Sequence, residues 1–166
     1  MMENNFVFEA DIAAKTIHMV REFNAPVEKV WKAFTDADLL GKWTAPKPYR
    51  IVTKTMNFTV GGIWLYSMVD TEGKSPWWTL MEFTAIDYCN AFSATGAFAD
   101  EAGNTDPDGP RSYRVTTFSS LEGNRTKMDM SIRFTHEATI KMFAEGGFKT
   151  NTALGYAQLD ELLAAE

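Results

Sequence analysis

The chain has 166 residues, of which 45% are hydrophobic and 23% charged, and its formal net charge is −6. This length suits one hydrophobic core, so we expect a single domain over residues 1–166 with its core at about 15–164. Lys and Arg are scattered, which argues against a nucleic-acid partner, and no apolar run approaches the roughly 18 residues of a membrane span. Because no signal-like segment opens the sequence and Cys89 is the single cysteine, we expect a cytoplasmic setting.

The first elements predicted along the chain are a strand and two short helices. Residues 15–24 alternate between polar and apolar side chains, which is typical of a strand. After Pro26, apolar residues recur with the spacing of an amphipathic helix, at Val27, Val30, Trp31 and Phe34. Residues 35–38 resemble a capping box, so a second short helix should begin there and end before Pro46.

The rest of the chain predicts a run of strands followed by a helix. We expect strands at 49–59, 62–69, 76–87, 89–96, 112–120 and 125–134, with a long polar loop at 99–111. Both faces of the strand at 62–69 are apolar, which implies that the protein covers both faces or that the strand lies at the rim of the sheet. A strand that is apolar on both faces would also permit a homodimer. Residues 136–164 predict a helix that Gly146 and Gly147 loosen or bend. Strands followed by a segregated helix indicate the α+β class.

No catalytic signature is present in the sequence. His18 and His136 lack neighbours at metal-ligand spacing, and Cys89 has no catalytic partner nearby. The sequence contains neither a phosphate-binding loop nor a dinucleotide fingerprint. We therefore name no catalytic residue and expect no metal and no cofactor.

The aromatic and methionine content is high, with 12 Phe, five Trp, five Tyr and nine Met. Such side chains fill cores, and they also line adaptable ligand cavities. Alternation and helical spacing give a candidate cavity lining: Trp64, Tyr66, Met68, Trp77, Met81, Phe92, Met128 and Met130 from the sheet, and Phe148, Thr152 and Tyr156 from the helix.

Three charged residues are candidates for polar anchors inside that cavity. Alternation or position aims Arg21, Glu82 and Arg114 inward. A buried charge is costly unless it is paired, so an inward Arg and an inward Glu could compensate one another. Two interpretations stay open: these residues hold the polar end of an apolar ligand, or they are strand-edge charges and a structural ion pair.

Four segments resemble a known family. REFNAPVEKVWKAFTD at 21–36 is the most specific, and LLGKW at 39–43, VGGIWLYSM at 60–68 and GYAQLDELL at 155–163 support it. They resemble the domain related to activators of the heat-shock-protein-90 ATPase, within the START-like (Bet v 1-like, SRPBCC) superfamily. The resemblance implies a helix-grip fold, in which a curved antiparallel sheet wraps around a long C-terminal helix. Two departures from the family pattern, at 44–46 and 88–91, should lie at the mouth or edge of the cavity.

The resemblance leaves three functions open. The first is a non-enzymatic module that binds a small, largely apolar molecule between the sheet and the C-terminal helix. The second is a chaperone cofactor whose partner is a chaperone ATPase. The third is an enzyme similar to polyketide cyclases or hydrolases, for which Arg21 and Glu82 are the only candidates we can name.

Overall fold

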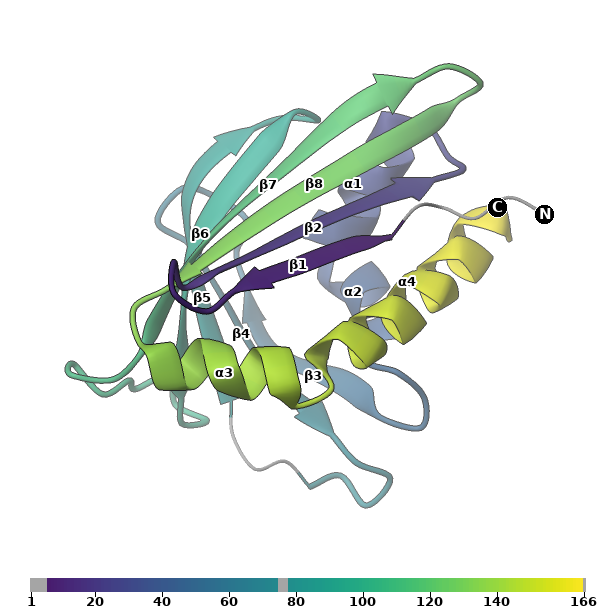
Figure 1. The fold of residues 1–166 in the computed structure, drawn as a ribbon. Helices are drawn as coiled ribbons and strands as arrows, with labels where there is room; N and C mark the ends of the chain where they lie inside the picture. Colours follow the sequence, from purple (N-terminus) through teal and green to yellow (C-terminus); the bar gives the residue numbers. More distant parts are fainter. Residues whose placement is uncertain (1–5, 75–77, 166) are drawn as a thin grey trace.

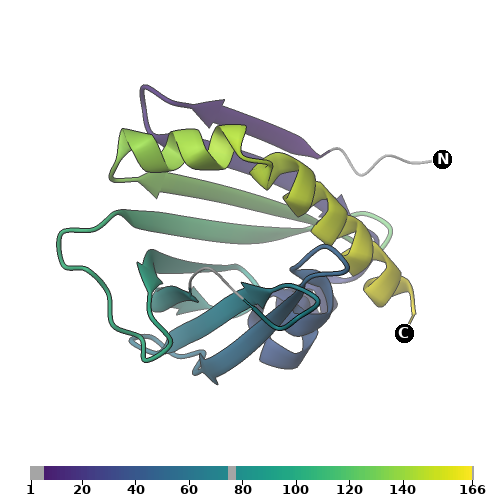
Figure 2. The same cartoon turned by 90° about the horizontal axis from the view of Figure 1, so that it is seen from below.

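The protein is an eight-stranded antiparallel sheet that curves around a C-terminal helix (Figures 1 and 2). The computed structural model describes residues 6–74 and 78–165. The sheet order is β1-β2-β8-β7-β6-β5-β4-β3. The strands are β1 (Val7–Asp11), β2 (Thr16–Phe23), β3 (Arg50–Met56), β4 (Ile63–Val69), β5 (Trp78–Asp87), β6 (Ala91–Ala99), β7 (Arg111–Leu121) and β8 (Arg125–Phe134). The helices are α1 (Val27–Thr35), α2 (Ala37–Trp43), α3 (Glu137–Glu145) and α4 (Phe148–Ala164). The predicted α+β helix-grip fold is confirmed.

One strand was not predicted from the sequence. β1 pairs antiparallel with β2, from Val7 opposite Val20 to Asp11 opposite Thr16, and forms an edge of the sheet. Most of its side chains are exposed, so it carries no clear apolar alternation. The two short helices therefore follow the second strand of the chain rather than the first.

The two short helices close one end of the curved sheet. In α1 the predicted apolar stripe faces inward, with Val27 only partly buried, and the rings of Phe34 and Phe118 of β7 lie 5.3 Å apart. The Asp36 carboxylate accepts hydrogen bonds from the backbone N–H groups of Asp38 and Leu39, which satisfies the first turn of α2. The Trp43 indole donates to the Ala33 carbonyl at 2.9 Å and ties α2 to α1.

The predicted C-terminal helix is divided into two helices by a glycine pair. Gly147 has a φ of 89°, and a Cβ at Gly146 would lie 2.4 Å from the Met142 carbonyl oxygen. Glycine adopts the positive φ at 147 without strain, and at 146 the absence of a Cβ avoids a clash with that carbonyl oxygen. The Phe143 and Phe148 rings lie 5.0 Å apart across this bend, so α3 and α4 remain in contact.

The second apolar face of β4 is covered by the chain itself. Leu65 and Val69 are buried on the face opposite Trp64. The Leu65 side chain lies against the long β6–β7 loop, where a Cβ at Gly103 would be 3.6 Å from it. The sequence predicted that this apolar face would be covered, and the polar β6–β7 loop provides part of that cover.

Side chains fill one end of the space between the sheet and the helices. There the Phe23 ring of β2 packs 5.6 Å from Tyr156 of α4, and Phe34 lies 4.9 Å from Trp43. Toward α3 and the start of β3 the interior is hollow. None of the described helices is long and apolar enough to cross a membrane.

Candidate functional site: an apolar cavity with one inner arginine

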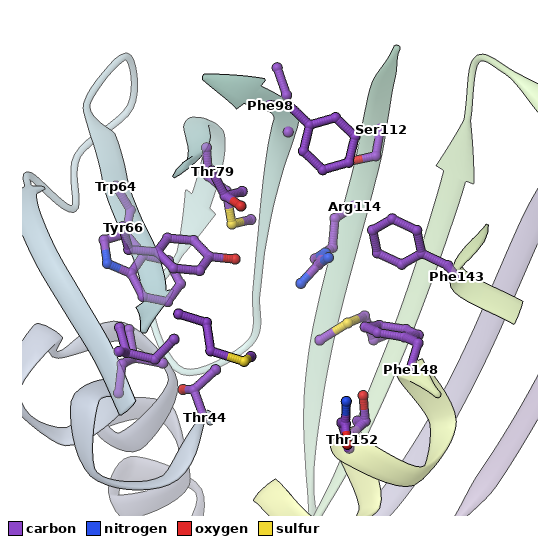
Figure 3. Close-up of a pocket in the computed structure, with 18 of the residues that line it drawn as sticks. Thr44, Trp64, Tyr66, Thr79, Phe98, Ser112, Arg114, Phe143, Phe148 and Thr152 are labelled. Atoms are coloured by element: carbon purple, nitrogen blue, oxygen red, sulfur yellow. The ribbon is translucent and has the colours of Figure 1, made fainter. Parts of the chain in front are cut away.

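A cavity of about 670 Å³ lies between the concave face of the sheet and the helices α3 and α4. Small-molecule sites commonly have volumes of about 300–1,000 Å³. Its wall is predominantly apolar and combines aromatic and methionine side chains from the sheet with Phe143 and Phe148 from the helices (Figure 3).

Most of the predicted lining lies on this wall. The structure places nine of the eleven predicted residues there: Trp64, Tyr66, Met68, Met81, Phe92, Met130, Phe148, Thr152 and Tyr156. Trp77 lies outside the described residues.

Met128 does not line the cavity, contrary to the prediction. It faces inward as expected and is fully buried, but it lies opposite Arg21 of β2 and Phe118 of β7. Phe118 is the residue on which α1 packs. Met128 therefore belongs to the filled end of the interior, whereas Met130, two residues further along β8, reaches the hollow end. Alternation predicts on which face of the sheet a side chain lies, but not whether its position along the strand is at the filled or the hollow end of the interior.

Glu82 also differs from the expectation, because it is exposed on the outer face of β5. Its neighbours Met81 and Phe83 are buried on the inner face, and period-two alternation puts Glu82 on the opposite one. Its place within an apolar stretch of sequence suggested burial, but the strand alternation decides its orientation. Glu82 can neither pair with an inward arginine nor reach the cavity.

Arg21 faces inward and is 8% exposed, but it forms a structural ion pair away from the cavity wall. Its guanidinium donates to both carboxylate oxygens of Asp160 on α4, at 2.9 and 2.7 Å. A third hydrogen bond goes to the Glu22 carbonyl at 2.8 Å. The ion-pair partner of Arg21 is thus Asp160 rather than Glu82. For Arg21 the interpretation as a structural ion pair therefore holds, not the one as an anchor for a ligand.

Arg114 lies on the cavity wall and points into it (Figure 3). Its neighbours across the sheet are Ala94 of β6 and Ile132 of β8, both buried and apolar. On the described part of the chain no carboxylate forms an ion pair with Arg114. Its buried Nε–H has no hydrogen-bond partner there either.

Two tyrosines flank Arg114 inside the cavity. Burial raises the pKa of Tyr66, while the positive charge of Arg114 and a hydrogen bond with Thr79 partly oppose this rise. Burial likewise raises the pKa of Tyr156, against the charges of Arg114 and Arg21. Both phenols are therefore neutral hydrogen-bonding groups at physiological pH. The Tyr66 ring is held in place by stacking on Trp64 at 3.8 Å.

Four further hydroxyl residues of the cavity wall are absent from the predicted lining. Thr44, Thr79, Ser112 and Thr116 all line the wall. The Thr44 and Thr116 hydroxyls are buried and have no hydrogen-bond partner among the described residues, and Thr116 is fully inaccessible to solvent. The inward orientation of Ser112 and Thr116 could have been predicted from the sequence, because period-two alternation along β7 places them on the same face as Arg114.

The cavity opens to solvent beside three exposed apolar side chains. Tyr49 precedes β3, Met68 lies near the end of β4 and Met142 belongs to α3, and all three also line the cavity. We call these three residues the cavity mouth. Asp70 and Lys74 lie at the rim of the wall beyond β4, where they close a turn.

The wall offers little for acid–base chemistry. The described wall contains no histidine, cysteine or glutamate. Asp70 is its one carboxylate, and its Oδ1 accepts hydrogen bonds from the backbone N–H groups of Glu72 and Lys74. Within the described residues, His, Cys, Asp and Glu do not gather in groups of three that could hold a metal ion.

The sequence profile described as activator of Hsp90 ATPase homolog 1-like protein matches residues 24–164. The chain belongs to this family. The family's START-like (Bet v 1-like, SRPBCC) superfamily agrees with the helix-grip architecture. No curated protein matches the chain closely enough to count as a relative.

Several solved structures share the fold over nearly the whole chain. A crystal structure of a Mycobacterium smegmatis protein has 26% identity and a TM-score of 0.84, covering 96% of this chain and 97% of that one. A solution structure from Arthrobacter aurescens has 28% identity and a TM-score of 0.84, covering 96% and 92%. An AHSA1 protein from Silicibacter pomeroyi has 16% identity and a TM-score of 0.67, covering 90% and 98%, and shows the fold alone.

The two departures from the family pattern lie in different places. Thr44 of the segment 44–46 is on the cavity wall, as expected. The segment 88–91 is not, because Tyr88 is exposed and packs on the Trp31 ring at 5.8 Å, outside the wall. Of the two segments, only the first therefore contributes to the cavity wall.

Proposed function

We propose that this family member is a non-enzymatic binding module that holds a small, largely apolar molecule in the cavity. The observation that carries the proposal is the cavity itself, about 670 Å³ with a mainly apolar wall. Protein interiors are close-packed and rarely keep voids much larger than a water molecule. Empty apolar volume is also destabilising, because the surrounding side chains lose packing contacts. A hollow of this size in a fold with an otherwise filled core is therefore best explained by a ligand.

The ionisable groups of the cavity favour binding over catalysis. General acid–base chemistry needs a group whose pKa lies near the working pH. Burial raises the pKa values of Tyr66 and Tyr156 above 10, far from neutral pH. These groups can orient a ligand by hydrogen bonding, but they are poor proton carriers at neutral pH.

The family description favours a second candidate, a protein-interaction module that acts on a chaperone ATPase. In that case the protein should bind the ATPase and change its turnover, with or without an occupied cavity. A pull-down combined with an ATPase assay tests this candidate. The absence of both association and any change in turnover would exclude it.

Blocking the cavity from the helix side tests the ligand proposal. Thr152 and Ala153 are neighbours on α4, and Thr152 lines the cavity while Ala153 is exposed. We expect the native chain and Ala153→Trp to bind the neutral dye N-phenylnaphthylamine equally. Thr152→Trp should weaken binding about tenfold or more, because the indole occupies the ligand volume. Equal binding by both variants, or no binding by the native chain, would overturn the proposal.

A further inference from the structure

We propose that the molecule held in the cavity is a monoanion whose carboxylate pairs with Arg114. This inference rests on the proposed binding function and adds the chemical class of the ligand. It starts from the contrast between Arg114 and the other arginines of the fold.

Three other arginines of the sheet, Arg21, Arg111 and Arg125, form hydrogen bonds or ion pairs within the protein, and Arg50 and Arg133 are exposed. Arg21 donates to Asp160 and to a backbone carbonyl, and Arg125 pairs with Glu22. Arg111 donates to the carbonyl oxygens of Gly109, Pro110 and Asp106 and to the Thr105 hydroxyl, at 3.0 to 3.3 Å. Arg133 lies on the outer face over the Tyr113 ring, 4.5 Å from its centroid.

Arg114 differs from the exposed Arg133 because it is half-buried on the cavity wall and has no acceptor on the described part of the chain. Its strand neighbours Ala94 and Ile132 are apolar, and its buried Nε–H makes no hydrogen bond. Glu82, the carboxylate that the sequence offered as a partner, lies on the other side of the sheet. A charged group in an apolar, partly buried wall is unfavourable unless something compensates it.

Further unused hydrogen-bonding groups lie on the same wall. Thr116 follows Arg114 by two residues on the same face of β7, is fully buried, and leaves its hydroxyl without a partner. The Thr44 hydroxyl is unpartnered as well. A guanidinium and two hydroxyls facing one apolar cavity form a donor set for an oxyanion.

A single carboxylate fits this donor set better than a phosphate dianion. The planar guanidinium matches a carboxylate through two parallel hydrogen bonds. One arginine balances one negative charge, and the other cationic side chains of the wall, Arg111 and Lys74, already interact with groups of the protein. The Arg111 guanidinium donates hydrogen bonds to backbone carbonyls. Lys74 lies at the rim, where its Nζ is 3.7 Å from Glu72 Oε1. Asp70 at the rim would repel a second negative charge near the mouth.

Matched apolar probes test the inference. Dodecanoate and dodecanol share one chain and differ in the head group, and each is titrated against bound N-phenylnaphthylamine at neutral pH. We expect the native chain to bind dodecanoate about tenfold or more tightly than dodecanol, although dodecanol is the more hydrophobic probe. Arg114→Gln should abolish this preference, because it weakens the binding of dodecanoate far more than the binding of dye or dodecanol.

Two further variants control for charge and geometry. Arg133→Gln removes the same charge from the outer face of the neighbouring strand and should change none of the three affinities. Arg114→Lys keeps the charge without the planar fork and should retain part of the preference. If Arg114→Gln does not fold, the native chain still provides a test. Its preference for dodecanoate should vanish below about pH 4, where the carboxyl group becomes protonated.

The outcomes separate the two proposals. If the dye and dodecanol bind but dodecanoate binds no better, or if Arg114→Gln keeps the preference, the monoanion inference is overturned and the binding function stands. If neither dye, alcohol nor carboxylate binds, both proposals fall.

Discussion

Arg21 and Asp160 connect the sheet to the C-terminal helix through two parallel hydrogen bonds, of 2.9 and 2.7 Å. Arg21 also lies 4.9 Å from the centroid of the Phe23 ring, so its guanidinium is held from two sides. Along α4, Thr152, Tyr156 and Asp160 follow at intervals of four residues and share one face of the helix. The pair therefore fixes the part of α4 that presents Thr152 and Tyr156 to the cavity.

We expect Asp160→Asn to lower the free energy of unfolding by about 2 kcal/mol, because the buried Arg21 loses a charged acceptor. Urea unfolding monitored by tryptophan fluorescence measures the change. Glu161→Gln, the neighbouring exposed carboxylate, is the control and should leave the unfolding midpoint nearly unchanged. Identical midpoints for the native chain and Asp160→Asn would show that the ion pair does not hold α4.

Replacing Arg114 should stabilise the ligand-free protein. Arg114→Met removes a charge that lacks a partner in the described structure and adds apolar contact to the wall. Substitutions of this kind at binding sites commonly add about 0.5–2 kcal/mol to stability. Thermal unfolding of delipidated protein provides the measurement, with Arg133→Met as the outer-face control. A loss of more than about 1 kcal/mol in Arg114→Met would mean that the protein itself compensates the charge.

Alkaline pH should destabilise the fold through Tyr66 and Tyr156. Their pKa values in the folded state are raised by burial, whereas an unfolded tyrosine has a pKa of about 10. Above that pH the unfolded chain loses protons that the folded chain keeps, so the free energy of unfolding falls. The slope is at most about 1.4 kcal/mol per pH unit for each tyrosine.

Urea unfolding between about pH 9 and 11 measures this slope around the unfolded pKa. Tyr156→Phe should make it shallower, while Tyr113→Phe, at an exposed position on β7, should not change it. Parallel curves for the native chain and Tyr156→Phe would contradict the assignment.

Gly147→Ala should destabilise the protein by about 1–2 kcal/mol, because the φ of 89° is unfavourable for a residue with a Cβ. Gly147→Asn should cost less, since asparagine tolerates the left-handed region better. Unfolding midpoints of the two variants give the comparison. If alanine were tolerated as well as asparagine, the bend between α3 and α4 would not depend on this backbone conformation.

The elements with strong periodicity could be predicted from the sequence, and the weakly patterned ones could not. The helical spacing of Val27 to Phe34 and the alternation of Met128 to Phe134 gave α1 and β8 nearly to the residue. β1 was missed because an exposed edge strand of five residues shows no apolar alternation. Its placement depends on pairing with β2, which is a tertiary contact.

The same limit applies to the candidate site. Alternation identified the inward face of Trp64, Tyr66 and Met68, and these side chains do line the cavity. It could not separate Met130 on the hollow end from Met128 on the filled end. The partner of Arg21 was also hidden, since Asp160 is 139 residues away in the chain and reaches it only when α4 docks on the sheet.

The most direct test of the cavity as a binding site is a crystal structure of the protein grown with saturating dodecanoate. We expect continuous density for the alkyl chain between the sheet and α4, with the carboxylate within hydrogen-bonding distance of the Arg114 guanidinium. A cavity that is collapsed and filled by its own side chains, or a probe bound only outside it, would show that the cavity is not a binding site.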